Sequence, residues 1–221
     1  MATVLNVGFI SCGNDEENSD NSSGSTYDVE RPTITIDVNG VTSTGSKFVL
    51  IDDTNFYIDY IQYSVKQGHL NVVGFDKTGF AGEARFYSVV TYKGNAYEVL
   101  EIEAKAFDHS ENLTSIIIPK GIKIIHESSF EDCHNLTSVS ISESVETIHT
   151  RAFHGCRKLT DVHCKRQIPP TVSGSSTNGG PIEYLTNSEV YLDATLYIPQ
   201  GSLNAYKEKN GWKDFGYIVE E

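Results

Sequence analysis

Two histidines and two cysteines recur at one common spacing, and these residue types could bind a metal ion or form a disulfide. His126 and His149 are 23 residues apart, as are Cys133 and Cys156. In a chain folded into stacked coils of that length, the paired side chains would lie about 5 Å apart, the distance between neighbouring strands. Two imidazoles could share a metal, but zinc sites in proteins need three or four ligands. No other ligand demonstrably converges on the pair, so we expect surface histidines, with no metal and no cofactor.

The chain has four cysteines, and none lies in a CxxC motif: Cys12, Cys133, Cys156 and Cys164. In adjacent coils, Cys133 and Cys156 could bring their Cα atoms within the range that a disulfide allows. Because both occupy a repeating column, we favour buried thiols, with a bridge in an oxidising compartment as the alternative.

Familiar catalytic patterns do not occur in the sequence. It contains no GxSxG, HExxH or P-loop motif, its acidic residues are spread along turns, and the adjacent Asp52 and Asp53 are a common turn pair. An enzyme needs a nucleophile with a base, paired acids in a cleft, or a metal. We therefore expect a protein that is not an enzyme.

An internal repeat organises the region that holds these residues. Between Ile102 and Cys164 the same apolar columns occur almost three times, 23 residues apart. The recurring residues are Ile102, Phe107, Leu113, Ile116 and Ile118, then Ile125, Phe130, Leu136, Val139 and Ile141, then Ile148, Phe153, Leu159, Val162 and Cys164. A period of roughly 20–29 residues is the signature of a solenoid, in which one coil cannot fold alone and stacking supplies the stability.

The strand of each coil turns alternate residues away from the core. Stacked strands convert these positions into ladders about 4.8 Å apart on one flat or concave face. This face is small and rich in hydroxyl groups, and a solvated face without a ligand is the alternative to a binding surface. The candidate ligand-binding residues on it are Ser115, Ile117, Ser138, Ser140, Asp161 and His163.

The repeat resembles a known family. Leu-x-x-Ile-x-Ile-Pro, then Ile, then Ala/Ser-Phe-x-x-Cys-x-x-Leu is similar to the BspA-like leucine-rich repeats of Bacteroides-type bacterial cell-surface proteins, with Ser110 in place of the first cysteine. The resemblance implies a leucine-rich repeat solenoid, a right-handed β/α superhelix of 23-residue repeats, with a β-rich N-terminal cap and a strand–helix C-terminal cap. It also implies a binding module for adhesion or recognition.

The rest of the chain divides by composition. We expect a partial lipoprotein signal at 1–12, a disordered acidic tether at 13–26, a β-rich N-terminal cap at 27–101, leucine-rich repeats at 102–167, a loop at 168–194 opened by Ile168-Pro-Pro170, and a C-terminal capping segment at 195–221. Turn and breaker residues mark these boundaries. In the capping segment, Ser202 is a plausible N-cap for a short helix over 203–209. Trp212, Phe215 and Ile218 should pack over the last coil.

Alternating strands fill the predicted N-terminal cap. Thr33–Val38 alternates and ends at the hairpin signal Asn39-Gly40, and Phe56–Val65 alternates as well. Aromatic residues at these positions are more often core or cross-strand pairs than a carbohydrate platform. The residues in question are Tyr57, Tyr60, Tyr63, Phe86, Tyr87 and Tyr92.

Charge and the N-terminus bear on location and partners. The net charge of −13 argues against nucleic acid and against attraction to anionic lipid. Phe9-Ile10-Ser11-Cys12 resembles a lipobox with Cys12 as the lipidated residue, although a secretory signal has a basic region and a longer apolar core. We expect an outer-membrane lipoprotein on the bacterial surface, or a secreted protein. It would be a monomer that binds an extracellular protein or a glycan, and it would touch a membrane only through its lipid anchor. A structural spacer that binds neither a protein nor a glycan is the third interpretation of the function.

Overall fold

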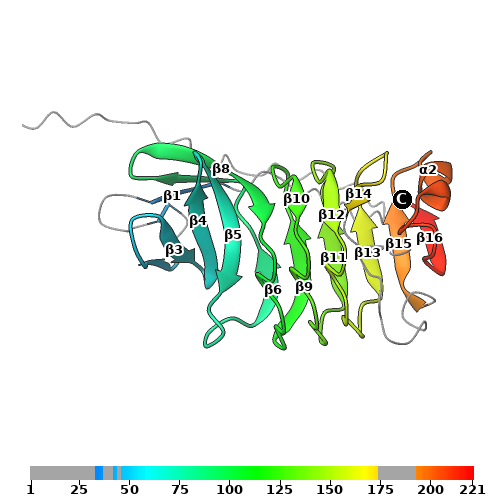
Figure 1. Ribbon diagram of the computed structural model, residues 1–221, viewed down its shortest axis with the longest axis horizontal. Coiled ribbons are helices and arrows are strands. Elements are labelled where there is room, and N and C mark those ends of the chain that lie inside the picture. The colour runs from blue at the N-terminus through cyan, green and yellow to red at the C-terminus, as the bar shows by residue number, and fades with distance from the viewer. Residues whose placement is uncertain (1–32, 37–41, 44–45, 174–192) are drawn as a thin grey trace, which may run out of the picture.

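Two sheets form the opposite walls of an elongated stack of coils (Figure 1). This computed structural model describes residues 33–36, 42–43, 46–173 and 193–221. The ten-stranded sheet has the order β14 (Thr171–Ser173), β12 (Thr147–His149), β10 (Ile124–Ile125), β8 (Asn95–Ile102), β5 (His69–Phe75), β4 (Ile61–Lys66), β3 (Asn55–Ile58), β2 (Phe48–Leu50), with β7 (Val89–Tyr92) on β8 and β1 (Thr33–Ile36) on β7. The six-stranded sheet has the order β16 (Tyr217–Glu220), β15 (Thr195–Ile198), β13 (Asp161–Cys164), β11 (Ser138–Ile141), β9 (Leu113–Ile118), β6 (Gly82–Arg85).

Each coil contributes one strand to each wall. Strands β8 and β9 belong to one coil, β10 and β11 to the next, and β12 and β13 to the one after. Their parallel register pairs Ile116 with Val139 and Val139 with Val162, which are 23 residues apart. The superhelix predicted as β/α is different in one respect. The return segments β10, β12 and β14 are short strands, each of which turns one β-branched residue, Ile125, Ile148 or Val172, toward the core.

The core between the walls is built as a column of rings. Phe107 stacks on Phe130 and Phe130 on Phe153, with 5.2 Å between ring centroids in both pairs. All three side chains are buried. Identical positions therefore bury one another from coil to coil, and each coil depends on its neighbours for its hydrophobic stabilisation.

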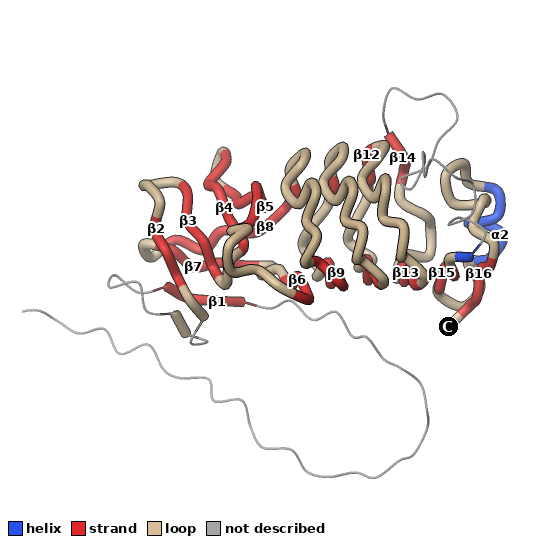
Figure 2. Tube along the Cα trace, turned by 90° about the horizontal axis from the view of Figure 1, so that it is seen from below, coloured by secondary structure: helices blue, strands red, loops and turns tan. Residues whose placement is uncertain are grey.

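The region predicted as an N-terminal cap joins both walls. Strand β5 pairs in parallel with β8, and β6 pairs in parallel with β9, so the coil arrangement begins before Ile102. Figure 2 shows the remaining strands of this region gathered at one end of the stack. Strand β1 pairs in parallel with β7, and Asn39-Gly40 lies outside the described residues.

The structure divides one alternating run of this region into two strands, and it bears on the less favoured interpretation of the aromatic residues. The alternating run Phe56–Val65 is a hairpin of β3 and β4, because Asp59 and Tyr60 adopt positive φ angles of 47° and 71° and reverse the chain. Three of the six aromatic residues considered for a carbohydrate platform, Tyr63, Phe86 and Tyr92, are buried in the core. Those three rings cannot contact a sugar, so a platform made of the six residues does not form.

The repeat also continues past the residues predicted to end it. Strand β14 lies inside the predicted loop 168–194 and pairs in parallel with β12, while β15 pairs in parallel with β13. Pro169 and Pro170 are tolerated because they fall between β13 and β14, where no ladder needs their missing N–H. Of the predicted loop, residues 174–192 lie outside the described part of the chain.

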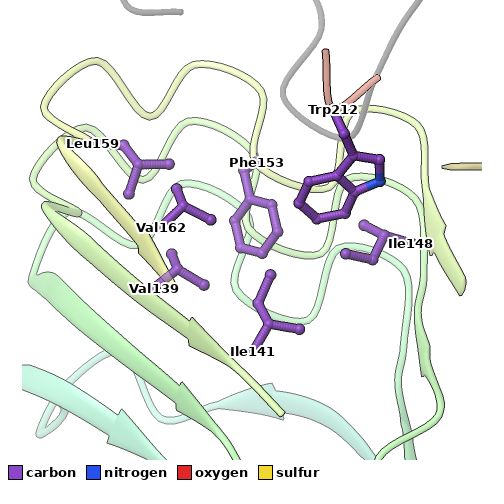
Figure 3. Close-up of a pocket in the computed structure, with 7 residues that line it drawn as sticks. All are labelled: Val139, Ile141, Ile148, Phe153, Leu159, Val162 and Trp212. Atoms are coloured by element: carbon purple, nitrogen blue, oxygen red, sulfur yellow. The ribbon is translucent and has the colours of Figure 1, made fainter. Parts of the chain in front are cut away.

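The C-terminal residues cover the last coil. Trp212 and Phe215 are buried and Ile218 packs against the core. The indole Nε1–H donates to the carbonyl of Pro170 at 2.9 Å. Trp212 also lines a small apolar void of about 10 Å³. Figure 3 shows the side chains that surround this void. A void of this size with no polar lining holds no water, so it is a packing gap and not a ligand site.

Helix α2 (Leu203–Glu208) is not capped as predicted. Ser202 precedes it, but its hydroxyl donates to the carbonyl of Pro199 at 2.6 Å. Glu220 of β16 accepts the N–H of Leu203 instead, at 2.9 Å. The helix start is therefore tied to the last strand of the six-stranded sheet.

Candidate functional site

The outward strand face is the solvent side of the six-stranded sheet, and it consists of two rows of side chains in register. One row is Glu83, Ser115, Ser138, Asp161, Thr195 and Tyr217. The other row is Arg85, Ile117, Ser140, His163, Tyr197 and Val219. All six candidate residues from the sequence lie in the middle of these rows. The structure thus brings them together on one face.

Ser140 is not accessible, contrary to the expectation for this face. Its side chain points outward, yet the residue is only 5% exposed and its hydroxyl has no hydrogen-bond partner among the described residues. Ile117 and His163 stand on either side of it in the row, and both are larger. The two neighbours therefore cover the short Ser140 side chain, whereas Ser138 in the other row is half-buried.

The aromatic end of the face consists of His163, Tyr197, Tyr217 and Val219. The rings of His163 and Tyr197 stack with centroids 4.4 Å apart and planes 9° from parallel. Tyr217 is 61% exposed and Val219 is 43% exposed, so two large apolar side chains meet solvent side by side on β16. Sequence reasoning missed this end because residues 195–221 were assigned to a cap. The alternation in Thr195–Ile198 and Tyr217–Glu220 is the signal that could have found it.

Carboxylates frame the aromatic end. The Tyr197 hydroxyl donates to Asp161 Oδ1 at 3.4 Å, and partial burial followed by the Asp161 charge raises the pKa of Tyr197. Glu221 bonds His163 Nδ1 at 3.2 Å and also pairs with Lys165. Burial would raise the pKa of Glu221, but the hydrogen bonds from Lys165 and His163 outweigh it and lower that pKa. The frame holds the stacked rings in a fixed orientation.

A second candidate is the turn groove, a depression of about 490 Å³ on the turns between the walls. Its lining residues are Ala104, Lys105, Asp108, His109, Glu127, Ser128, Glu131 and Arg151. Lys105, Ser128 and Arg151 hold equivalent turn positions, with φ angles of 61°, 57° and 62°. The groove therefore follows the repeat.

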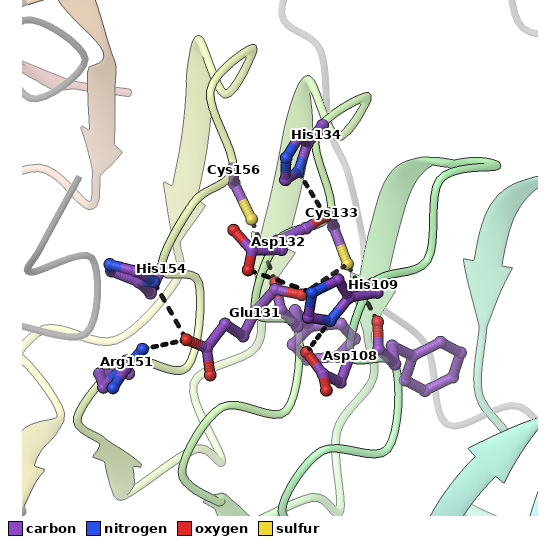
Figure 4. Close-up of polar contacts among 11 residues, drawn as sticks. Asp108, His109, Glu131, Asp132, Cys133, His134, Arg151, His154 and Cys156 are labelled. Carbon is purple, nitrogen blue, oxygen red and sulfur yellow. Dashed lines mark hydrogen bonds and ion pairs between the residues drawn. The ribbon is translucent and has the colours of Figure 1, made fainter. Parts of the chain in front are cut away.

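Several charged side chains in and beside the turn groove pair with one another (Figure 4). His109 contacts Asp108 at 2.6 Å, and Glu131 pairs with Arg151 and with His154 at 3.2 Å. Burial would raise the pKa of Glu131, but a hydrogen bond from Ser128 and the Arg151 charge lower it. The pairs of Glu131 with Arg151 and His154 connect neighbouring coils, so we assign them to stacking and not to a ligand.

The repeating histidines lie on the opposite wall. The rings of His126 and His149 stack at 5.1 Å, and Nε2 of His126 contacts Oε2 of Glu101 at 2.9 Å. Burial and then the charge of His126 lower the pKa of His149. Within the described residues, no three His, Cys, Asp or Glu side chains converge closely enough to hold a metal.

The repeating cysteines are separate thiols in the structure. Cys133 and Cys156 are buried, and each Sγ lies 3.2 Å from the phenylalanine carbonyl of the preceding coil, Phe107 or Phe130. Burial raises the pKa of Cys156 and of Cys164. These cysteines act as small core residues and weak donors. Cys12 lies outside the described residues.

The family follows from the repeats themselves. Residues 87–178 match the model of the BspA type leucine rich repeat region, in six copies. These are BspA-type leucine-rich repeats. The resemblance drawn from the motif is confirmed, and the described chain has the strand-rich leucine-rich repeat fold that goes with it. No curated protein matches this chain in sequence.

Three solved structures are similar to this chain. A leucine-rich repeat protein from Bacteroides capillosus is 19% identical over 66% of this chain and 99% of its own, with a TM-score of 0.49. One from Bacteroides ovatus is 26% identical over 66% of this chain and 47% of its own, with a TM-score of 0.47. A leucine rich cell surface protein from Faecalibacterium prausnitzii is 17% identical over 68% and 46%, with a TM-score of 0.46. The chain thus spans just under half the length of the last two.

Membrane insertion by a helix finds no candidate in the described residues, since none of their helices is both long and apolar enough to cross a bilayer.

Proposed function

We propose that this protein is a non-enzymatic binding module of the bacterial cell surface that recognises an extracellular protein, as an adhesin does. The binding surface is the outward strand face, and its aromatic end supplies the main contacts with the partner. The observation that carries the proposal is the pair of exposed apolar side chains on β16, Tyr217 and Val219, beside the stacked His163 and Tyr197.

Protein partners suit this surface for two reasons. Tyrosines supply a large share of the binding energy at protein interfaces, usually at the centre of a patch with a polar rim. Here Tyr197 contacts the carboxylate of Asp161, and the paired Lys165 and Glu221 add further polar groups through the bond of Glu221 to His163. The stack also gives a long, rigid surface, which suits recognition of a folded partner.

The proposed location on the cell surface rests on the type of repeat and on the name of a similar structure, and not on the geometry of this protein. The repeat motif resembles that of bacterial cell-surface proteins, and one similar structure is named a cell surface protein. Lipidation of Cys12 would supply the anchor to the outer membrane. Intact mass of the protein from a Bacteroides host, compared with a Cys12→Ala variant, tests the anchor. An equal mass for the two, apart from the substitution, contradicts it.

The binding experiment uses the full chain and two double variants. The protein is passed over immobilised matrix proteins and polysaccharides, together with Tyr217→Thr/Val219→Thr. The matched control is Glu83→Thr/Arg85→Thr, which changes the same two rows at the other end of the sheet. Threonine keeps the strand propensity in both. We expect a protein hit that weakens at least about tenfold in the β16 variant and stays unchanged in the control.

The same panel separates the alternatives. A glycan hit would favour an accessory lipoprotein of surface carbohydrate uptake. Silence across the panel would favour a structural spacer. A protein hit that both double variants retain would remove the aromatic end as the site.

A further inference from the structure

Strand β16 ends the six-stranded sheet and has a free edge within the described part of the chain. It pairs on one side with β15, in parallel register from Tyr217 to Glu220. The N–H of Glu221 donates to the carbonyl of Ile198 in β15, at 2.8 Å. Peptide groups alternate along a strand, so residues 217, 219 and 221 bond β15. The N–H and C=O groups of Ile218 and Glu220 therefore point to the free edge.

The side chains along this edge favour pairing. Edge strands are usually protected by charged residues that discourage a further strand. The outward side chains of β16 are Tyr217 and Val219, both exposed and both uncharged. A strand added here would place its own alternate side chains directly beside these two, where aromatic and β-branched pairs are favourable.

A second copy of the chain fits this edge poorly. Each copy carries a net charge of −13, so two acidic molecules would repel one another. The strand has four residues and is about 13 Å long, so pairing confined to it would bury far less than the roughly 1,200 Å² of a stable dimer. A short extended segment has neither difficulty, and a basic one gains from the negative charge.

We infer that β16 is a docking edge for an extended, basic segment of a partner protein, which adds a seventh strand to the six-stranded sheet. Main-chain hydrogen bonds to Ile218 and Glu220 give the affinity, and contacts with Tyr217 and Val219 select aromatic or branched side chains at alternate positions. This inference extends the proposed function, because it names the form in which the partner binds.

The test is a selection of random heptapeptides displayed on phage against the full-length protein, followed by binding of the selected peptides to two variants. Glu220→Pro removes the N–H at the edge and leaves the bonds to β15 in place. Glu220→Ala keeps that N–H but, like the proline variant, loses the carboxylate that accepts the N–H of Leu203. The two variants therefore differ at the edge and not at the helix.

We expect basic peptides with alternating aromatic or β-branched residues, bound equally by wild type and Glu220→Ala and about tenfold more weakly by Glu220→Pro. If Glu220→Pro does not fold, hydrogen exchange of wild type replaces it, and the Ile218 and Glu220 amides should slow when peptide binds.

Three results would overturn the inference. They are equal binding by both variants, failure to select any peptide, and self-association in sedimentation that Glu220→Pro abolishes. The first two leave the proposed function standing if the protein hit still depends on Tyr217 and Val219. Loss of that dependence, with edge pairing intact, would instead contradict the proposed function.

Discussion

At one end of the six-stranded sheet β6 turns Glu83 and Arg85 toward solvent, and at the other end β16 turns Tyr217 and Val219 toward solvent. Glu83 and Arg85 form an ion pair with each other, and the carboxylate of Glu83 also accepts a bond from Ser115 at 3.5 Å. Tyr217 and Val219 can form no such pairs. The same two rows of one sheet therefore begin charged and end apolar, and the apolar end is the one proposed to bind a protein partner.

The two ends also differ in what lies behind them. At the β6 end, the strands β5, β4, β3 and β2 extend the ten-stranded sheet. Behind β16 lie α2 and a small aromatic cluster, in which Tyr206 meets Trp212 edge-on at 5.5 Å. The apolar end is thus a thin layer over the last coil, and its shape depends on few residues. We therefore expect local unfolding to begin at this end, which is also the surface proposed to bind a partner.

The largest expected effect tests that dependence. Trp212→Ala should lower the free energy of unfolding by about 3–5 kcal/mol, because it removes a buried indole and the bond to Pro170. Hydrogen exchange should rise in β13, β15 and β16 while β6 and β9 stay protected. Chemical denaturation and exchange mass spectrometry measure both.

A central variant sets the contrast. Phe130→Ala has a similar expected cost of about 3–5 kcal/mol, but its ring stacks on Phe107 and on Phe153, so exchange should rise on both sides of it. If Trp212→Ala also raises exchange uniformly along the stack, the two ends are not independent and the comparison fails.

The middle of the face gives the next effect. Ser140→Lys should cost about 1–3 kcal/mol, because a long side chain must displace Ile117 or His163 from above a covered position. Ser138→Lys, two residues earlier on β11 and half-buried in the other row, should stay within about 0.5 kcal/mol. Equal costs would show that Ser140 is not covered, and the accessible face would then extend from the aromatic end into the centre.

The repeat could be predicted from the sequence because its equivalent residues recur at one constant spacing, and this spacing determines which residues pair between coils. Phe107, Phe130 and Phe153 stand at one spacing, and only stacking of equivalent coils buries all three. The limits of the stack were harder to predict. Pro169 and Pro170 indicated a stop, but a proline between two strands costs no ladder bond, and pairing of β14 with β12 is decided by contacts distant in sequence.

The candidate face shows the same division. Alternation placed Ser115, Ser138 and Asp161 in one row, as the structure has them. Accessibility could not be read in this way, because the exposure of Ser140 depends on the size of its neighbours across the sheet and not on its own strand. Tyr217 and Val219 were missed for a related reason. Strand β16 follows a turn and a helix, outside the period of the repeat.

Acid should weaken the apolar end by a smaller amount. The pKa of Glu221 lies below its usual 4.5 in the folded protein, so the unfolded chain takes up the proton first as pH falls. The stabilisation is complete above pH 4.5 and is lost as pH falls through the lower folded pKa. Because the group is partly exposed, the loss should be under about 1 kcal/mol. Unfolding of wild type and Glu221→Gln at pH 6 and pH 3 measures it, and a stability difference that does not shrink at pH 3 would contradict the pairing with Lys165 and His163.

The smallest effects on stability belong to the two double variants that separate the ends. Tyr217→Thr/Val219→Thr and Glu83→Thr/Arg85→Thr should each change the free energy of unfolding by no more than about 0.5 kcal/mol, since all four side chains lie on the surface. The two variants should differ in the hydrophobicity of their surfaces. The first variant should elute earlier than wild type from a hydrophobic-interaction column, and the second should not. A loss of stability above roughly 1 kcal/mol in the first variant alone would mean that Tyr217 and Val219 hold the end of the stack together, and their exposure would then reflect the fold and not a binding surface.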